Sequence, residues 1–266
     1  MARFCPLFSS SSGNCIYIGA SGGGILIDVG VSAKRTVNAL RQIGVSPEDI
    51  SAVFITHEHS DHIRGLKTLL KRTDIPLFAP RTVASRLWGM LPESDGKLNP
   101  IPVETEITLG DLRFTAFPTP HDTPQSVGYR LEDGTHTFCL CTDLGHVTDV
   151  VLDYLTDADA VVIEANHDEE MLKLGPYPVP LKRRILSDNG HLSNHACARL
   201  AVTLAEHGTE QFVLGHISKE NNTPRLAYDT VAEALNRSGH GDTYLAAAPA
   251  EGCLTIPVGR RTPCSR

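Results

Sequence analysis

The stretch Thr-His-Glu-His-Ser-Asp-His at residues 56–62 follows directly on the apolar run Ala-Val-Phe-Ile at residues 52–55. An apolar run that stops at a His/Asp cluster predicts a buried strand that delivers ligands at its C-terminal end, the edge where open α/β sheets place their sites. Imidazole nitrogens and carboxylate oxygens are ligands for divalent zinc, manganese or iron. The alternative, a surface loop that happens to be rich in His, is disfavoured by the density of the pattern.

Three further candidate ligands share the position of this cluster at the end of a predicted strand. They are His121 after strand 112–117, Asp143 after strand 136–141, and His216 after strand 211–215. Either histidine alone would more often be an ordinary loop residue. With the first cluster, the full set is His57, His59, Asp61, His62, His121, Asp143 and His216. Seven ligands are too many for one tetrahedral ion and suit two ions that share a bridging carboxylate.

Composition bounds the class of protein. The chain has 266 residues, of which 41% are hydrophobic and 21% charged, as expected for one large α/β domain or two small ones. The formal net charge of −7 argues against a basic nucleic-acid coat protein. It does not exclude a nucleic-acid enzyme, because bound metals and a local basic patch can supply a positive field.

The hydrophobic pattern predicts a two-sheet sandwich flanked by helices, as one domain over 1–266 with a frayed tail at 260–266. Predicted strands are 3–8, 15–19, 24–29, 52–56, 76–79, 101–103, 106–109, 112–117, 126–131, 136–141, 160–164, 211–215, 242–247 and 253–257. Predicted helices run from Ser32 to Gly44, over 63–72 and 80–90, from Ser193 to Gly208, and onward from Thr223.

The predicted setting is cytoplasmic. No window approaches eighteen consecutive apolar residues, and the N-terminus lacks the long apolar segment of a signal peptide. The seven cysteines are odd in number and form no C-x-x-C pair, which favours reduced thiols. The pattern Cys139-Leu-Cys141 places both thiols on one face of a strand, as core residues. No membrane contact or obligate protein partner is evident, and the oligomeric state is open.

Across nearly its full length, the chain resembles the metallo-β-lactamase fold superfamily of metallohydrolases. The resemblance implies an α/β, four-layer αββα sandwich, with two mixed sheets flanked by helices. It also implies how the ligands divide: His57, His59 and His121 hold one metal, Asp61, His62 and His216 the other, and Asp143 bridges them. Asp28 in LIDVG matches the carboxylate that orients a ligand histidine, although a strand-end turn residue is the alternative.

More narrowly, the chain resembles the WalJ/YycJ-like branch of this superfamily. The matching stretches are SSSSGNC (9–15), VIEANHDEEML (162–172), YPVPLKRRI (177–185), GHLSN (190–194) and LGHISKENNTP (214–224). Ser10 stands where the branch has Gly, which puts in doubt only the backbone geometry of that loop. This resemblance implies a DNA exonuclease of 5′-to-3′ direction.

Catalytic roles follow from the chemistry of such a site. Two ions a few ångströms apart lower the pKa of a shared water, and the bridging hydroxide attacks a phosphoryl group whose charge they neutralise. Asp61 is placed to orient or deprotonate that water. His191, just ahead of the helix at Ser193, is the candidate proton donor, and Glu164 can hold its tautomer. This pair resembles the Glu and His of tRNase Z-like nucleases; the alternatives are a helix-entry His and a strand-end surface Glu.

Candidate substrate contacts are Ser10, Asn14, Lys182, Ser193 and Asn194. The loop from Ser10 to Asn14 can cradle an anion, or simply form a hairpin turn. The basic run that begins at Lys182 can contact phosphates, or be a solvated helix face.

Ligand spacing separates the chain from several relatives of the superfamily. His121 and Asp143 are 22 residues apart, too few for the tRNA-binding arm of tRNase Z, and Asp143 and His216 are 73 apart, too few for a β-CASP domain. We therefore expect a metal-dependent hydrolase with two divalent ions (Zn, Mn or Fe) that acts on phosphodiesters, with DNA as the substrate partner. The alternatives are a small-molecule phosphodiesterase, a thioester or lactam hydrolase, and a non-catalytic metal-binding regulator.

Overall fold

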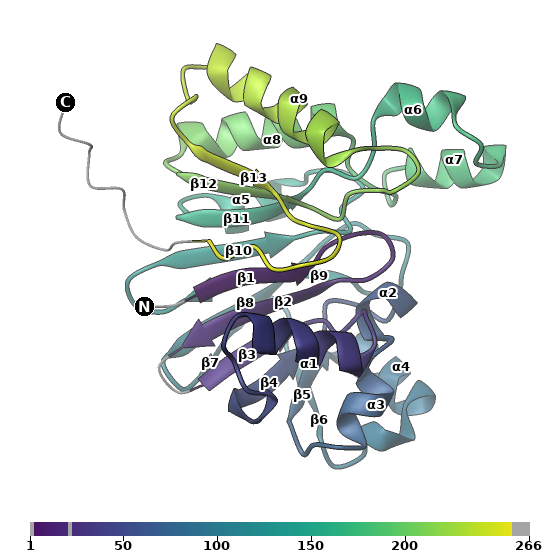
Figure 1. The fold of residues 1–266 in the computed structure, drawn as a ribbon, viewed down its shortest axis with the longest axis vertical. Coiled ribbons are helices and arrows are strands. Elements are labelled where there is room, and N and C mark those ends of the chain that lie inside the picture. The colour runs from purple at the N-terminus through teal and green to yellow at the C-terminus, as the bar shows by residue number, and fades with distance from the viewer. Residues whose placement is uncertain (1–2, 21–22, 257–266) are drawn as a thin grey trace.

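Residues 3–20 and 23–256 are described by a computed structural model, in which two sheets pack face to face with helices on their outer faces (Figure 1). The strand order is β1-β2-β3-β4-β5-β6 in one sheet and β13-β12-β11-β10-β9-β8-β7 in the other. Each sheet contains both parallel and antiparallel pairs. The expected four-layer αββα sandwich is confirmed.

The N-terminal sheet begins as an antiparallel meander and continues with parallel strands. Its strands are β1 (Arg3–Phe8), β2 (Cys15–Ala20), β3 (Gly23–Ile27), β4 (Ile50–Phe54), β5 (Leu77–Pro80) and β6 (Leu98–Ile101). Its helices are α1 (Ala33–Gln42), α2 (Ser60–Ile63), α3 (Leu66–Leu70) and α4 (Arg81–Met90), with 3-10 turns at Pro47–Asp49 and Pro92–Ser94. Because the last strands are parallel, their C-terminal ends share one edge of the sheet.

The C-terminal sheet is antiparallel from β7 to β10 and parallel from β10 to β13. Its strands are β7 (Glu106–Leu109), β8 (Leu112–Pro118), β9 (Val127–Glu132), β10 (Thr137–Cys141), β11 (Ala160–Glu164), β12 (Gln211–Gly215) and β13 (Tyr244–Ala247). Its helices are α5 (Asp149–Leu155), α6 (Glu169–Leu174), α7 (Val179–Ile185), α8 (Asn194–Glu206) and α9 (Pro224–Arg237).

Alternation along the strands divides the core into layers. Between the sheets, Phe54 stacks on Phe114 with ring centroids 4.4 Å apart, and Phe4 stacks on Phe138 at 5.5 Å. The opposite faces pack against helices, and Cys139 and Cys141 both lie in the cluster beneath α5, α8 and α9. The prediction that these two thiols share a core face is confirmed.

Three residues at strand ends adopt the left-handed backbone conformation. The φ angle is 62° at Asp28, 56° at Asp143 and 51° at His216. Non-glycine residues rarely occupy this region, and such positions concentrate at functional sites. Here they occur where β3, β10 and β12 end, which turns each side chain toward the shared edge.

The predicted helix at 63–72 is wrong, because the chain forms two short helices, α2 and α3, on either side of Gly65. A Cβ at Gly65 would lie 2.2 Å from the Val31 carbonyl oxygen, so the break allows a close backbone approach. The strand predicted at 101–103 is found at 98–101.

At the C-terminus, the strand predicted at 253–257 is also wrong: Ile256 makes only an isolated bridge with Phe4, and Pro257 lies outside the described residues. The tail at 260–266 lies outside them as well. Of the helices in the described ranges, none combines the length and the apolar character that crossing a bilayer requires.

Candidate metal centre

All seven predicted ligands meet at the edge where the strands of both sheets end. Their ligand atoms fall into overlapping groups, within each of which every atom lies within 4.8 Å of the others. The groups are His57, His59 and His121; Asp61, His62 and His216; His57, His62 and Asp143; and Asp143, Glu164, His191 and His216. Two of the four groups contain the residues that the family resemblance assigns to the two ions, and the other two groups overlap them, so the division between two ions stays a prediction.

The first group is a buried set of imidazoles. The His57 ring lies 4.6 Å from that of His59 and 5.0 Å from that of His121, centroid to centroid. Burial holds the pKa of His57 well below its usual range, and burial also lowers the pKa of His121, so both favour the neutral form that binds metals. Within residues 3–20 and 23–256, the buried His57 Nε2 has no hydrogen-bond partner.

The second group combines a carboxylate with two imidazoles. Asp61 Oδ2 lies 3.4 Å from both His62 Nε2 and His216 Nε2. Burial alone would raise the pKa of Asp61, but the neighbouring His62 charge and the hydrogen bonds from His216 and His62 lower it. Asp61 is therefore an ionised carboxylate in this arrangement.

Asp143 lies between the two groups. Its Oδ1 is 3.7 Å from His121 Nε2 and 3.5 Å from His216 Nε2, and its Oδ2 is 3.3 Å from His62 Nε2. Although burial opposes it, the charges of His216 and His62 hold the pKa of Asp143 well below its usual range. Oδ2 is also a buried oxygen without a hydrogen bond in the described part of the chain. This placement is the one that a shared ligand needs.

A hydrogen-bond network behind the ligands fixes their orientation. Asp28 Oδ2 lies 2.7 Å from His62 Nδ1, which directs His62 Nε2 toward the ligand cluster. Asp28 also accepts hydrogen bonds from the Thr56 backbone and hydroxyl, each at 2.9 Å. The Thr56 hydroxyl in turn lies 3.0 Å from His57 Nδ1. Sequence reasoning missed Thr56; its only signal was its place directly before His57.

Glu164 is fully buried and contacts two histidines with one oxygen. Its Oε1 lies 2.8 Å from His191 Nδ1 and 2.7 Å from His216 Nδ1. Its Oε2 accepts hydrogen bonds from the backbone N–H groups of Leu144 and Leu192. Burial opposes ionisation, but the charge and hydrogen bond of His191 lower the pKa of Glu164 to about 2. The alternative of a surface pair does not hold, and the contact with His216 was not predicted.

A cavity of about 240 Å³ opens onto these groups. Asp61, Asp143 and His191 line it, together with Ser11 of the β1–β2 loop. Tyr177, which precedes α7, and Arg184, in the last turn of α7, also line it. His191 lies at the cavity wall with Nδ1 4.0 Å from Asp143 Oδ1. A small phosphoryl group in this space would contact both the ligand set and His191.

The candidate substrate contacts are placed differently from one another. Asn14 Nδ2 lies 3.1 Å from His62 Nε2 and 3.4 Å from Asp61 Oδ2, so Asn14 contacts the candidate ligands themselves. Ser10 is buried, with its hydroxyl 2.9 Å from that of Ser12. The loop that holds them is a turn after β1, as its alternative interpretation proposed, and its next residue, Ser11, reaches the cavity.

Like Ser10 and Asn14, the other three candidates are not among the residues that line the cavity. Lys182 Nζ donates to the Lys173 carbonyl, Ser193 caps α8 by accepting from Ala196 N–H, and Asn194 pairs with the amide of Asn222. Their contact with a substrate stays a prediction.

One charged residue beside the cavity, Asp122, was missed by sequence reasoning, whereas Arg184 belongs to the basic run that was predicted to contact phosphates or to be a solvated helix face. Arg184 forms an ion pair with Asp122, whose Oδ1 lies 3.3 Å from His121 Nε2 and 3.8 Å from His59 Nε2. Asp122 directly follows His121, which was its only signal in the sequence, and Arg184 is the last residue of the basic run at 182–184.

The residues present fit divalent metal ions. The donor set is nitrogen and oxygen only, as zinc, manganese and iron accept. The unbonded His57 Nε2 and Asp143 Oδ2 are buried polar atoms of the kind that a bound ion satisfies. Asp28, Thr56 and Glu164 hold the ligand orientation from behind, as is usual at metal sites.

Comparison with known proteins places these features in a family. Residues 24–217 match the family model of the beta-lactamase superfamily domain. The chain is 34% identical over 247 residues to "Exodeoxyribonuclease YycJ" of Bacillus anthracis, covering 90% of this chain and 91% of that protein. It is 37% identical over 246 residues to "Exodeoxyribonuclease WalJ" of Streptococcus pneumoniae, covering 90% of each.

Among solved structures, Zn²⁺-bound PqqB of Methylobacterium extorquens has the same fold. It superposes with a TM-score of 0.73 over 97% of this chain and all of the other, at 17% sequence identity. At that identity the likeness shows the fold alone. The family match, the two relatives of similar length and the shared fold agree, and the chain belongs to the beta-lactamase superfamily domain family, as a homologue of the YycJ and WalJ proteins.

Proposed function

We propose that the protein is a metal-dependent hydrolase that cleaves phosphodiester bonds of DNA. The observation that carries the proposal is the position of His191, which lines one cavity with five of the seven candidate ligands and contacts the buried carboxylate of Glu164. The metal ligands alone are compatible with many hydrolase activities. Cleavage of a phosphodiester bond also releases an alkoxide, which needs a proton donor. The two homologous relatives are named exodeoxyribonucleases, which supports DNA as the substrate.

The proposed cofactor is a pair of divalent ions. His57, His59 and His121 would hold one ion, Asp61, His62 and His216 the other, and Asp143 would contact both. When bound, such ions acidify a water molecule and neutralise charge on the attacked phosphoryl group. Whether they are zinc, manganese or iron is not decided by an N/O donor set, so elemental analysis of protein purified without added metal is the measurement.

The side chains perform the remaining steps. Asp61 is ionised and can accept a hydrogen bond from the attacking water, with Asn14 holding its carboxylate in place. Although burial opposes it, the charge of Glu164 and its hydrogen bond from Nδ1–H raise the pKa of His191, so a protonated His191 could give its Nε2 proton to the departing oxygen and become the neutral imidazole. Arg184, the cation on the cavity wall, can neutralise a non-bridging phosphate oxygen.

A panel of substrates tests the bond class. Metal-loaded protein is incubated with end-labelled duplex DNA, bis-p-nitrophenyl phosphate, a chromogenic cephalosporin and a thioester. We expect cleavage of the two phosphodiesters. Cleavage of only the cephalosporin or the thioester would sink the nuclease proposal and favour a lactam or thioester hydrolase. Cleavage of the small ester but not DNA would identify a small-molecule phosphodiesterase.

We further propose 5′-to-3′ polarity and a cytoplasmic setting. The polarity follows the resemblance to the WalJ/YycJ-like branch, and the six cysteines among the described residues form no disulfide, which suits a reducing compartment. Duplexes labelled at either end test polarity, because 5′-to-3′ digestion releases a 5′ label first and a 3′ label last. Cell fractionation tests the compartment.

A further inference from the structure

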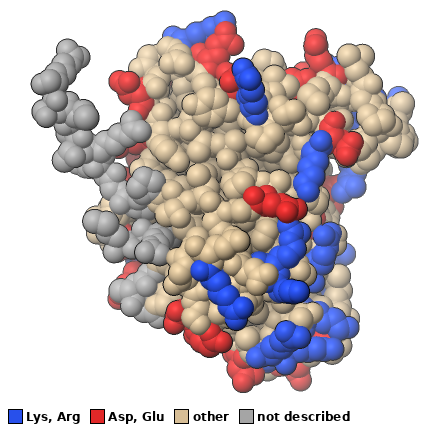
Figure 2. Space-filling view, viewed as in Figure 1, with Lys and Arg blue, Asp and Glu red and all other residues tan. Residues whose placement is uncertain are grey.

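A basic surface lies beside the metal centre, on a chain whose overall charge is negative. Residues 60–90 contain six Lys or Arg but only two Asp, whereas the whole chain has a net charge of −7. The six cations, which we call the basic surface, are Arg64, Lys67, Lys71, Arg72, Arg81 and Arg86, and all are exposed. Figure 2 shows Lys and Arg gathered at the lower right, where Figure 1 places α1, α3 and α4.

Several of these cations have no acidic partner. In the described ranges, Arg64, Arg72 and Arg81 form no ion pair, and Arg64 donates only to the Ser12 carbonyl at 3.1 Å. Lys67 and Lys71 share the single carboxylate of Glu93. Exposed cations that lack acidic partners give the surface a positive potential, so this surface is complementary to a polyanion.

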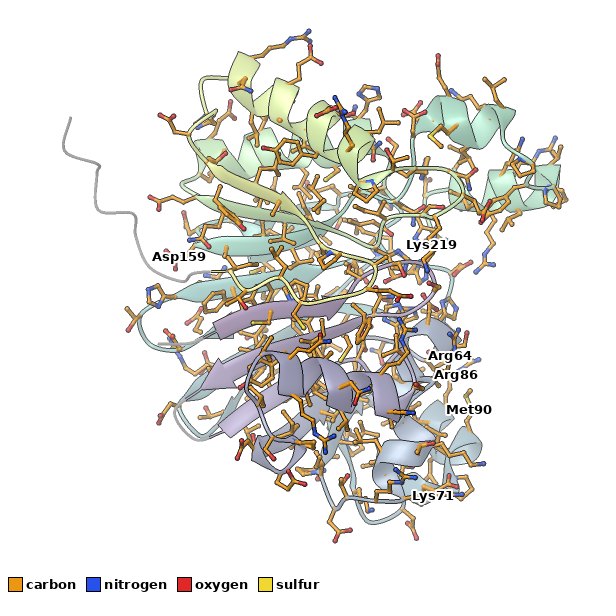
Figure 3. The ribbon with its side chains drawn as sticks, viewed as in Figure 1. Arg64, Lys71, Arg86, Met90, Asp159 and Lys219 are labelled. Atoms are coloured by element: carbon orange, nitrogen blue, oxygen red, sulfur yellow. The ribbon has the colours of Figure 1, made fainter. Side chains whose placement is uncertain are left out.

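The basic surface is attached to the metal centre. Arg86 Nε lies 2.7 Å from Oε1 of Glu58, which stands between His57 and His59. Thr82 N–H donates to Gln125 Oε1 at 3.0 Å, in the loop that also carries His121. In Figure 3, Arg64 and Arg86 lie at the edge where the strands end, and Lys71 lies further down. α4 thus connects the ligand loops to the surface beyond them.

A groove with an exposed aromatic side chain lies on the same helix. Trp88 on α4 is 66% exposed, although a large aromatic residue in a surface helix is usually covered. The groove, which we call the Trp88 groove, has a volume of about 400 Å³. Arg81, Ser85, Trp88, Asp95, Leu98 and Pro100 are among the residues that line it. It therefore offers a cation, an indole face and polar atoms within one space.

We propose that the Trp88 groove and the basic surface form a docking site for single-stranded DNA, one that holds part of the strand away from the bond being cleaved. This inference rests on the proposed nuclease function. Cations that follow the phosphates combined with an aromatic side chain that stacks on a base are what proteins use to bind single strands. Arg81 can contact a phosphate while the indole stacks on the base, and Ser85 and Asp95 can bond to base edges.

Trp88 is also the reporter for the test, because it is the single tryptophan of the chain. Oligo(dT) of about 12 nucleotides, within the ~4–16-nucleotide sites typical of such channels, is titrated into the protein without added metal. Stacking should quench the tryptophan fluorescence in a saturable manner, and added salt should reverse the quenching. If the oligonucleotide binds by a separation assay but leaves the fluorescence unchanged, the docking site is refuted, as it is if no binding occurs.

Variants separate docking from catalysis. Trp88→Ala should weaken oligonucleotide binding about 5- to 150-fold, and Trp88→Phe should restore most of it. Hydrolysis of bis-p-nitrophenyl phosphate should stay unchanged, because that ester does not reach beyond the metal centre. The matched control is Tyr228→Ala, which removes an aromatic residue that is 40% exposed on α9. Equal losses in both variants would refute a specific role for Trp88.

The outcomes also distinguish this inference from the proposed function. If DNA quenches Trp88 but metal-loaded protein cleaves neither DNA nor the small ester, docking stands and the nuclease proposal fails. If DNA is cleaved with the same KM by Trp88→Ala, the nuclease proposal stands and the docking site fails. A protein concentration-dependent dimer that Trp88→Ala abolishes, without any effect on DNA binding, would identify a second copy of the chain as the occupant and overturn the inference.

Discussion

Glu164 serves two histidines with one carboxylate, and this sharing can be tested. In Glu164→Gln the neutral amide orients both rings less firmly, since Oε1 now carries no charge toward His191 and His216. Substitution of a group that orients metal ligands typically costs about 10- to 100-fold in metal affinity or activity. We expect losses of that size in both kcat and metal affinity, measured by steady-state rates and competition with a chelator. A loss in one quantity alone would show that the shared contact is incidental.

His191 is assigned to proton donation rather than metal binding. His191→Ala should keep its metal content but lose about 10²- to 10⁴-fold in kcat with a substrate that has a poor leaving group. The loss should shrink with a p-nitrophenyl ester, whose leaving group needs no proton. His195→Ala, an exposed histidine on the same segment, is the control. Equal effects on both substrates would contradict the assignment.

Asp143 is assigned to both ions, so its substitution should change stoichiometry. Asp143→Asn replaces a buried carboxylate in contact with His62, His121 and His216 by a weaker, neutral ligand. The ratio of metal to protein should fall, as measured by elemental analysis after dialysis. Asp153→Asn, an exposed carboxylate on α5, should leave the ratio unchanged. A full complement of metal in Asp143→Asn would refute the shared-ligand role.

At the residue scale, the sequence identifies ligands that come directly after a strand and misses the residues that lie beside them in space. His121, Asp143 and His216 can be found because an apolar run ends just before each. Thr56, Asp122 and Arg184 carry no such signal, because their value depends on distances across the fold. Threonine before a ligand, or arginine in a basic run, has many ordinary explanations in sequence alone.

At the scale of elements, two glycines offer a matched pair. Gly65→Ala places a Cβ 2.2 Å from the Val31 carbonyl oxygen, so the backbone between α2 and α3 must shift. We expect a loss of about 2–4 kcal/mol in the free energy of unfolding. In Gly89→Ala the new Cβ meets nothing within 4 Å, and the better helix propensity should stabilise α4 by up to about 1 kcal/mol. Urea denaturation measures both; a neutral Gly65→Ala would show that the helix break has another cause.

Long elements were predicted well, whereas short ones were not. The sequence predicts Ser32 and Ser193 as N-caps of two helices, and in the structure both serine side chains accept a hydrogen bond from a backbone N–H of the first helical turn. α5, α6 and α7 have six or seven residues each, too few for a helical period to be recognised. The break between α2 and α3 depends on a contact with a distant backbone carbonyl, which no local pattern contains.

At the scale of the whole molecule, metal binding should be coupled to stability. The metal-free site keeps buried carboxylates and imidazoles together with polar atoms that lack hydrogen-bond partners among the described residues. A ligand that binds only the folded state at about 100 times its Kd adds ~2.7 kcal/mol, which for a chain of this size raises Tm by about 5–10 °C. Calorimetry of protein treated with EDTA, then reloaded with Zn²⁺ or Mn²⁺, measures this shift. If metal binds but Tm does not change, the metal does not bind the folded state in preference to the unfolded state, and the predicted coupling is wrong.

The composition of the whole chain gave the least information about where a nucleic acid could bind. The net charge of −7 argued against a basic nucleic-acid coat protein and left any basic patch unlocated, whereas residues 60–90 alone carry a surplus of four positive charges. The fold concentrates these cations because α2, α3 and α4 cover neighbouring strands of one sheet. A charge count in short windows would have found the segment, but not its position beside the metal centre.

The left-handed backbone at Asp143 and His216 affects how readily mutation would remove the metal centre during evolution. Each of these conformations costs of order 1–3 kcal/mol, and glycine would relieve the strain at either position. Any lineage in which only folding is still selected would therefore find mutations that erase the metal centre to be neutral or even favourable. The presence of Asp and His at these two strained positions therefore indicates that selection for metal binding, and not for folding alone, has retained them.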